Sequence, residues 1–192
     1  MKKKINDIAH FKNFSEVLKN ASDTYKNIIF VKYKNNNFTF EQFNNLVNSC
    51  CNFFTSIGLK KKDVVCINFQ NSIEFLIIYF SSIRYGAILN PLPVNLSNDE
   101  ILRKIKFLNA KILFTSYKNK NFYKNKKVKV NFLDQNNFID LISNFNSSYI
   151  EEHNEKISMY YYSSGTTSNQ KIIEYSNKAM IHGNNNLLKS KF

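Results

Sequence analysis

Apolar side chains recur at helical spacing in three segments of the sequence, and each segment opens with a pair of polar residues that can cap a helix. The paired residues are three positions apart: Thr39 and Gln42, Asn71 and Glu74, and Ser97 and Glu100. In such a pair the first side chain accepts a hydrogen bond from the first helical turn, and the second reaches back to the cap. The first two stripes stop at Gly58 and Gly86, which suit a helix end. We predict three helices that begin at these pairs.

Short runs of apolar and β-branched residues lie between and around these helices. They cover residues 28–33, 63–69, 87–91, 111–116, 128–133 and 158–162. Helices that alternate with short strands predict an α/β fold with a mainly parallel sheet flanked by helices. The basic, Asn-rich residues 117–127 and the polar residues 143–157 are expected to be exposed connections.

The composition is that of one folded unit with a strong positive charge. Among 192 residues 43% are apolar and the formal net charge is +13, which raises the question of a nucleic-acid partner. Only Arg84 and Arg103 are arginines, whereas arginine is the preferred reader of guanine. Lysine is spread along a sequence rich in Asn, Lys, Ile and Phe. We therefore attribute the charge to compositional bias and do not expect nucleic-acid binding.

Cysteine usage and the apolar segments indicate a cytoplasmic protein. The three cysteines, Cys50, Cys51 and Cys66, lack CxxC spacing, which argues against a disulfide framework or a zinc site. The basic N-terminus is not followed by the apolar core of a signal peptide. The most apolar stretch, residues 73–89, is interrupted by Glu74 and Arg84, so no transmembrane segment is predicted.

The stretch "SSGTTSNQK" at residues 163–171 has the chemistry of a phosphate-binding loop. Glycine lets backbone approach a ligand closely, hydroxyls and successive N–H groups can surround an anion, and Lys171 adds a positive charge. It is not a Walker A loop, because Lys171 follows Gln170 and precedes Ile172. Taken alone, the stretch is either a phosphate loop or a polar turn that joins two strands.

The surrounding residues resemble the adenylate-forming (AMP-binding) superfamily, whose phosphate-binding signature is Y-[TS]-S-G-T-T-G-x-P-K-G-V. The matching positions are Tyr162, Ser163, Ser164, Gly165, Thr166, Thr167 and Lys171. Upstream segments resemble further motifs of this family in the same order: Thr39-Phe40-Glu41, Gly58-Leu59, Asp63-Val64, residues 71–75, and Gly86-Ala87 with Pro91. The resemblance runs from about Phe38 to Ser176 and implies the first part of the family's large N-terminal domain.

The resemblance implies ATP-dependent activation of a carboxylic acid. In this family the carboxylate attacks the α-phosphate of ATP, which gives an acyl-adenylate and pyrophosphate, and a thiol such as coenzyme A then takes the acyl group. The loop holds the β- and γ-phosphates, assisted by Mg²⁺. Carried over position by position, the ATP-binding residues are Ser163, Ser164, Gly165, Thr166, Thr167 and Lys171. No catalytic residue and no protein ligand to a metal is assigned.

Two departures from the family pattern shape what we expect of this chain. Ser168, Gln170 and Ile172 replace Gly, Pro and Gly of the signature, and a serine forced to positive φ would add strain of about 1 kcal/mol or more. The sequence ends at Phe192, before counterparts of the later adenine, ribose and C-terminal lysine motifs. We expect residues 1–192 to form a partial AMP-binding N-terminal domain, with the phosphate motif at 162–172 and no C-terminal domain. Such a fragment would be inactive alone or would work with a companion chain.

Three other interpretations stay open. "NPLPVNLSNDEI" at residues 90–101 looks more like acyl-CoA ligases than amino-acid adenylation domains, but a fragment of the latter is an alternative. A non-catalytic binding or assembly module could use the basic surface, and a degraded gene product would have no function.

The cluster of Glu151, Glu152, His153 and Glu155 is expected to be a solvated loop, because consecutive residues do not easily converge on one metal ion.

Overall fold

A six-stranded sheet forms the centre of the protein in this computed structural model, which describes residues 7–116, 120–123, 130–133, 138–149, 156–163 and 171–190. The strand order is β6-β5-β3-β4-β7-β8. The strands are β3 (Val64–Asn68), β4 (Ile88–Pro91), β5 (Ile112–Ser116), β6 (Val130–Leu133), β7 (Ile157–Tyr162) and β8 (Ile172–Ser176). Neighbouring strands from β6 to β7 are parallel, and only β8 runs antiparallel to its partner, β7. The predicted α/β fold with a mainly parallel sheet is confirmed.

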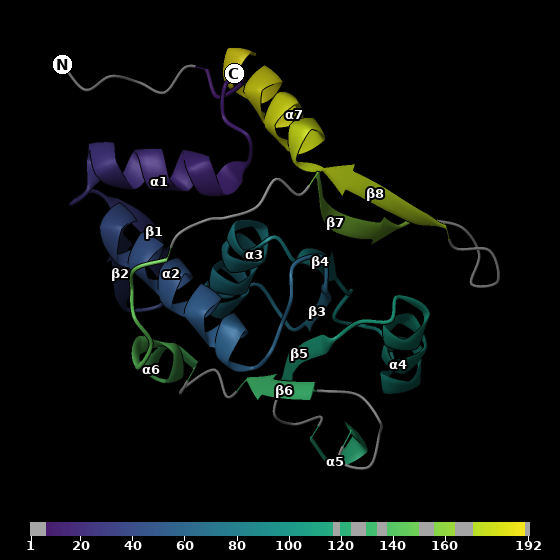
Figure 1. Cartoon of the computed structure of the whole chain (residues 1–192). Coiled ribbons are helices and arrows are strands. Elements are labelled where there is room, and N and C mark those ends of the chain that lie inside the picture. Colours follow the sequence, from purple (N-terminus) through teal and green to yellow (C-terminus); the bar gives the residue numbers. More distant parts are fainter. Residues whose placement is uncertain are drawn as a thin grey trace.

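Helices cover both faces of this sheet, and a small hairpin lies apart from it (Figure 1). The helices are α1 (Phe14–Tyr25), α2 (Phe40–Ser56), α3 (Ile73–Tyr85), α4 (Asn98–Phe107), α5 (Lys120–Tyr123), α6 (Phe138–Ser143) and α7 (Asn177–Lys189). The hairpin pairs β1 (Ile29–Tyr33) with β2 (Asn36–Thr39). Among the described residues, no helix is long and apolar enough to cross a membrane.

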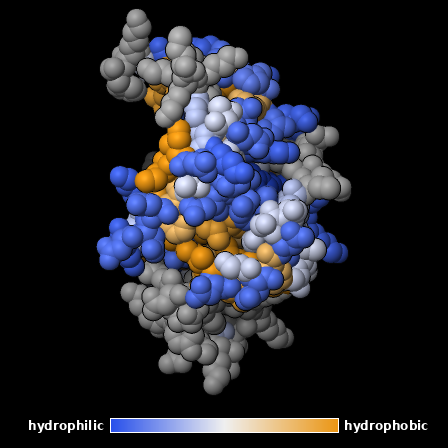
Figure 2. Space-filling view, turned by 90° about the vertical axis from the view of Figure 1, so that its left-hand side faces the viewer, coloured by the Kyte–Doolittle hydropathy of each residue, from blue (hydrophilic) through white to orange (hydrophobic). Residues whose placement is uncertain are grey.

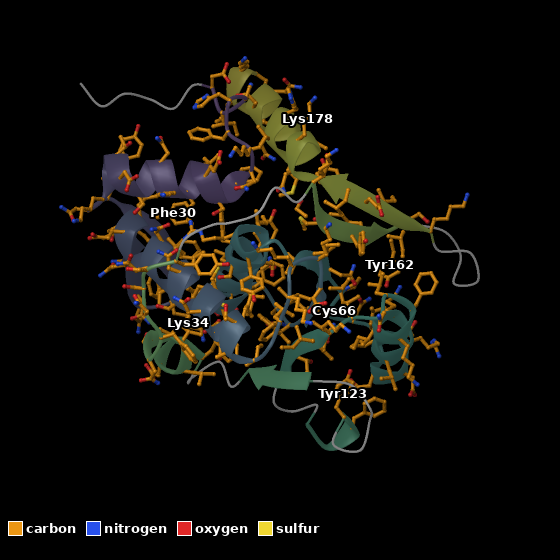
Figure 3. All side chains as sticks on the ribbon, in the orientation of Figure 1. Phe30, Lys34, Cys66, Tyr123, Tyr162 and Lys178 are labelled. Carbon is orange, nitrogen blue, oxygen red and sulfur yellow. The ribbon has the colours of Figure 1, made fainter. Side chains whose placement is uncertain are left out.

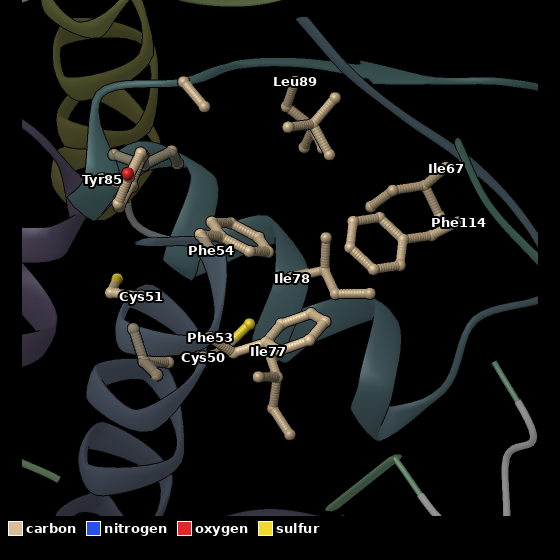
Figure 4. Close-up of a cluster of buried hydrophobic side chains, with 14 of the residues drawn as sticks. Cys50, Cys51, Phe53, Phe54, Ile67, Ile77, Ile78, Tyr85, Leu89 and Phe114 are labelled. Atoms are coloured by element: carbon tan, nitrogen blue, oxygen red, sulfur yellow. The ribbon is translucent and has the colours of Figure 1, made fainter. Parts of the chain in front are cut away.

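Alternation along each strand divides the core between the two faces. On β3, Val65 and Ile67 join the larger core with α2 and α3, while Val64 and Cys66 join a smaller core with α4. Successive side chains of a strand point to opposite faces, so both sets are buried only where helices cover both sides. Figure 4 shows the larger core, where side chains of α2 and α3 meet those of the central strands.

Two of the three predicted helix starts have the expected capping geometry. Thr39 and Ser97 each form a full capping box, with Gln42 and Glu100 respectively. The third start is wrong by one residue, because Ser72 rather than Asn71 caps α3 by accepting a hydrogen bond from the N–H of Phe75 at 3.2 Å. Gly86 ends α3 with φ of 81°, a conformation that a side chain would make costly.

Several other expectations needed correction. The run at residues 28–33 is a strand, but it pairs with β2 and lies outside the main sheet. The expected loop at 117–127 contains the short helix α5.

Residues 144–149 form the expected connection after α6, and side chains of α2 donate hydrogen bonds to their carbonyls. Asn48 Nδ2 donates to the carbonyl of Ser147 at 2.7 Å, and Asn52 Nδ2 donates to that of Asn146 at 2.7 Å.

Arg84, the last-turn arginine of α3, joins three helices from a buried position. Only 3% of it is exposed. Its Nε donates to Ser15 Oγ of α1 at 2.7 Å, and its Nη1 donates to Asn48 Oδ1 of α2 at 2.6 Å. Longer bonds reach the carbonyls of Asn44 and Ser15, both at 3.4 Å. The guanidinium therefore sets how α1 and α2 sit against α3.

Candidate phosphate-binding site

The predicted phosphate loop connects the antiparallel strands β7 and β8. Tyr162 and Ile172 are paired at the end of this ladder. Beyond them, the N–H of Ser163 donates to the carbonyl of Lys171 at 2.9 Å, and the N–H of Lys171 donates to Ser163 Oγ at 3.0 Å. The two ends of the predicted motif are therefore brought together. Ser164, Gly165, Thr166 and Thr167 lie outside the described residues, as do Ser168 and Gln170.

The Ser163 hydroxyl keeps its capacity to bind an anion in this arrangement. Its oxygen accepts from the backbone N–H of Lys171, and a hydroxyl group that accepts a hydrogen bond still has one proton to donate. The side chain of Lys171 is exposed at the same place. A hydroxyl donor and an ammonium group at the base of one turn suit a negatively charged oxygen such as that of a phosphate.

The turn emerges at the carboxyl end of a parallel strand, which is the edge where open α/β sheets bind ligands. β7 runs parallel to β4, so the loop after β7 lies at the same edge as the ends of the central strands. Polar side chains gather there. Asn90 Nδ2 donates to the carbonyl of Tyr160 at 2.7 Å, Asn68 Nδ2 to that of Pro93 at 2.7 Å, and Thr115 Oγ1 to that of Asn68 at 3.2 Å.

Tyr162 is the last strand residue before the turn, and it is held by a contact that the sequence did not indicate. The Nζ of Lys104, from α4, lies 3.5 Å from the centre of the Tyr162 ring, a cation–π contact. Burial raises the pKa of the Tyr162 hydroxyl and lowers the pKa of the Lys104 ammonium. Both shifts follow from the loss of water around a charged form. The contact links α4 to the strand end at which the loop begins. Figure 3 labels Tyr162 at this place.

Other candidate chemistry is not brought together in the described part of the chain. No group of three or more His, Cys, Asp or Glu residues there could hold a metal ion, and the cluster at Glu151, Glu152, His153 and Glu155 lies outside it. The three cysteines are buried and free. Burial raises the pKa of Cys50 and of Cys66 to about 12, so both are protonated near neutral pH and make poor nucleophiles.

The comparison with known families settles where this fold belongs. The sequence model of the family described as "AMP-binding enzyme" matches residues 18–190. The chain belongs to the AMP-binding enzyme family. That match includes Ser163 and Lys171 and the strands β7 and β8 next to them. The resemblance to the adenylate-forming (AMP-binding) superfamily that the sequence showed is confirmed.

Relatives and solved structures agree on the fold. Long-chain-fatty-acid–CoA ligase FadD13 of Mycobacterium tuberculosis (strain ATCC 25618 / H37Rv) is 32% identical over 63 residues, or 33% of this chain and 12% of that protein. Crotonobetaine/carnitine–CoA ligase of Escherichia fergusonii is 28% identical over 81 residues, or 42% of this chain and 16% of that protein. The anthranilate CoA ligase AuaEII, solved with anthranoyl-AMP, superposes with a TM-score of 0.74 at 21% identity, over 86% of this chain and 35% of that one.

A structure of the N-terminal domain of FACL13 from Mycobacterium tuberculosis superposes with a TM-score of 0.75 at 19% identity, over 87% of this chain and 45% of that one. The chain therefore spans less than half the length of these AMP-binding proteins. At these sequence identities the superpositions establish the fold of this chain, but they do not establish its activity.

Proposed function

We propose that this chain supplies the phosphate-binding part of an ATP-dependent enzyme that activates a carboxylic acid, of the acyl-CoA ligase type. The observation that carries the proposal is the hydrogen-bonded pair of Ser163 and Lys171, which brings the two ends of the AMP-binding signature together at the carboxyl edge of the sheet. Membership of the AMP-binding enzyme family supports the same assignment.

In the proposed reaction the substrate carboxylate attacks the α-phosphate of ATP, and pyrophosphate leaves. Ser163, Ser164, Gly165, Thr166, Thr167 and Lys171 contact the β- and γ-phosphates, which leave together as pyrophosphate. Hydroxyl, backbone N–H and ammonium donors fixed before the reaction stabilise the negative charge that moves onto the leaving group. In the second step the thiol of coenzyme A is the proposed acceptor of the acyl group, and AMP is released from the acyl-adenylate.

The donor groups at this site fit the phosphates of ATP. They are not ligands for Mg²⁺, which would be held by the phosphates instead. The Ser163 hydroxyl can donate a hydrogen bond and the Lys171 ammonium carries a positive charge, whereas Mg²⁺ requires oxygen ligands. We therefore infer that phosphate oxygens and water would hold Mg²⁺ here, where the ion neutralises phosphate charge. None of the described residues is assigned as its ligand.

ATP binding by the chain alone is the direct test. Titration calorimetry with ATP and Mg²⁺ should give saturable binding, which Lys171→Ala weakens about tenfold or more through the loss of one charge-assisted contact. Lys178→Ala is the matched control, because Lys178 is an exposed lysine a few residues away on α7. Equal affinities in the Lys171 and Lys178 variants would refute the assignment of Lys171.

Acid-dependent exchange of pyrophosphate into ATP tests the remainder of the proposal. We expect no exchange by the 192-residue chain alone and exchange after addition of a companion polypeptide that carries the later motifs. Exchange by the isolated chain would refute the need for such a companion. Salt-sensitive binding of nucleic acid or anionic vesicles that Lys171→Ala leaves unchanged, without ATP binding, would instead favour the non-catalytic module with its net charge of +13.

A further inference from the structure

A second candidate site lies on the side of the protein opposite the loop. A pocket of about 810 Å³ opens between the β1–β2 hairpin, α2, the first turn of α3 and α6. Figure 2 faces this side of the molecule, where hydrophobic residues are visible among hydrophilic ones. In Figure 3, Lys34 at the pocket and Tyr162 at the loop lie on opposite sides. The pocket is large enough for a small organic molecule.

A buried glutamate is among the residues that line this pocket, and one oxygen of its carboxyl group has no hydrogen-bond partner among the described residues. Glu74, in the first turn of α3, is 4% exposed, and its Oε2 has no partner among the described residues. The N-terminus of a helix favours negative charge, which explains why α3 tolerates the group. It does not replace a hydrogen bond, and burial of an unpaired carboxylate is costly. A ligand that donates to Oε2 would recover this free energy.

The other lining residues indicate the shape and polarity of such a ligand. Leu46, Ile73 and Ile139 supply apolar surface beside Glu74. Lys34 and Asp140 also line the pocket, but both are exposed to solvent and carry opposite charges. The buried carboxyl group of Glu74 is therefore the acidic feature that distinguishes the interior of the pocket from its mouth. It calls for a cationic donor, whereas the apolar surface calls for a hydrocarbon chain or ring.

We propose that this pocket binds a small molecule with a primary ammonium group beside an apolar chain or ring, and that the ammonium donates to Glu74 Oε2. Ammonium–carboxylate hydrogen bonds are among the stronger ones in proteins. The overall charge of +13 repels cations, so selective binding of an amine would reflect the local site. The proposal is independent of the phosphate loop, and ATP binding would survive its failure.

The test compares hexylamine, which is protonated at neutral pH, with the uncharged 1-hexanol. Titration of the ¹⁵N-labelled chain, followed by amide chemical shifts, should give saturable binding of hexylamine about tenfold tighter than that of 1-hexanol. The shifts should concentrate in residues 36–46, 73–74 and 139–147. No saturable binding of hexylamine, equal affinities for the two compounds, or shifts spread over the surface would overturn the proposal.

Two variants and a control sharpen the result. Glu74→Gln keeps the shape but removes the charge, and it should abolish the preference for the amine. Glu174→Gln makes the same change at an exposed position of β8 and should leave the preference intact. If Glu74→Gln does not fold, Asn45→Trp decides instead, because Asn45 is exposed and lines the pocket. A bulky side chain there should weaken both ligands about tenfold or more, and unchanged affinity would place the amine elsewhere.

Discussion

Replacement of Arg84 by methionine tests how the helices are joined around the larger core. Methionine keeps most of the length of the side chain and removes every donor of the guanidinium. The change leaves four acceptors on α1 and α2 without the bonds that Arg84 supplies: Ser15 Oγ, Ser15 O, Asn44 O and Asn48 Oδ1. Two of these bonds are short, at 2.7 and 2.6 Å.

The size of the effect follows from those two short bonds. A hydrogen bond to a charged group contributes about 1.5–3 kcal/mol, and an unsatisfied buried acceptor costs a comparable amount. Methionine recovers part of this through apolar burial, as replacements of buried charged groups by apolar ones have shown. We expect Arg84→Met to lower the free energy of unfolding by about 3 kcal/mol, and the melting temperature of a chain of this size by roughly 6–12 °C.

Urea unfolding, followed by circular dichroism, measures the change as a shift in midpoint at constant slope. The chain supplies its own control, since Arg103 on α4 is exposed and is the other arginine of the sequence. Arg103→Met should change stability by less than about 0.5 kcal/mol. Equal losses in the two variants, or a loss below about 1 kcal/mol for Arg84→Met, would show that the buried network does not join the helices as argued.

Three further predictions concern the loop, a helix cap and the thiols. Ser163→Ala should weaken ATP binding about threefold to tenfold, because it removes a hydroxyl donor and leaves the Lys171 N–H without its acceptor. Ser163→Thr keeps a hydroxyl and should keep most of the affinity. Titration calorimetry compares the variants, and an unchanged affinity of Ser163→Ala for ATP would exclude a role for Ser163. Hydrogen bonds from Ser97 lower the pKa of Glu100, so its contribution to stability is present above its ordinary pKa and is lost as the pH falls through the lower, folded-state value. Urea midpoints should fall with acidification in that window, and Glu100→Gln should reduce this dependence; an identical pH profile in the variant would contradict it. Burial raises the pKa of Cys50 and Cys66 to about 12. Iodoacetamide at pH 8 should therefore label these thiols only after denaturation, which mass spectrometry of the labelled peptides measures. Rapid labelling of the native chain would refute their burial.

Local patterns in the sequence were sufficient where each element depends on its neighbours along the chain. The capping boxes at Thr39 and Ser97 form as predicted because both members of each pair lie within one helical turn. At α3 two adjacent residues, Asn71 and Ser72, could both cap, and Ser72 has the extended backbone that places its hydroxyl at the N–H of Phe75. When two adjacent residues both favour the N-cap position, the sequence does not show which of them takes it.

Strand pairing could not be derived in the same way. The run at 28–33 has the apolar character of a sheet strand, yet β1 pairs with β2, which follows it after two residues. A strand after the loop was only one of two readings of the sequence, and the antiparallel pairing of β8 with β7 was not predicted, because the residues of β8 are mostly exposed and their order comes from that pairing. Partners in a sheet are chosen by contacts between distant parts of the chain, which local periodicity does not contain.

The sequence by itself determined the α/β class, the family and the residues of the phosphate motif, because each is written in the order and spacing of side chains. Of that motif, the described structure brings Ser163 and Lys171 together, and the roles of all six residues stay predictions. Only the tertiary structure decided that Lys104 covers Tyr162, that Arg84 joins three helices, and that Glu74 faces a pocket with an unpartnered oxygen. Those features depend on which side chains meet after the helices pack on the sheet, since burial and unmet hydrogen bonds are properties of the packed chain.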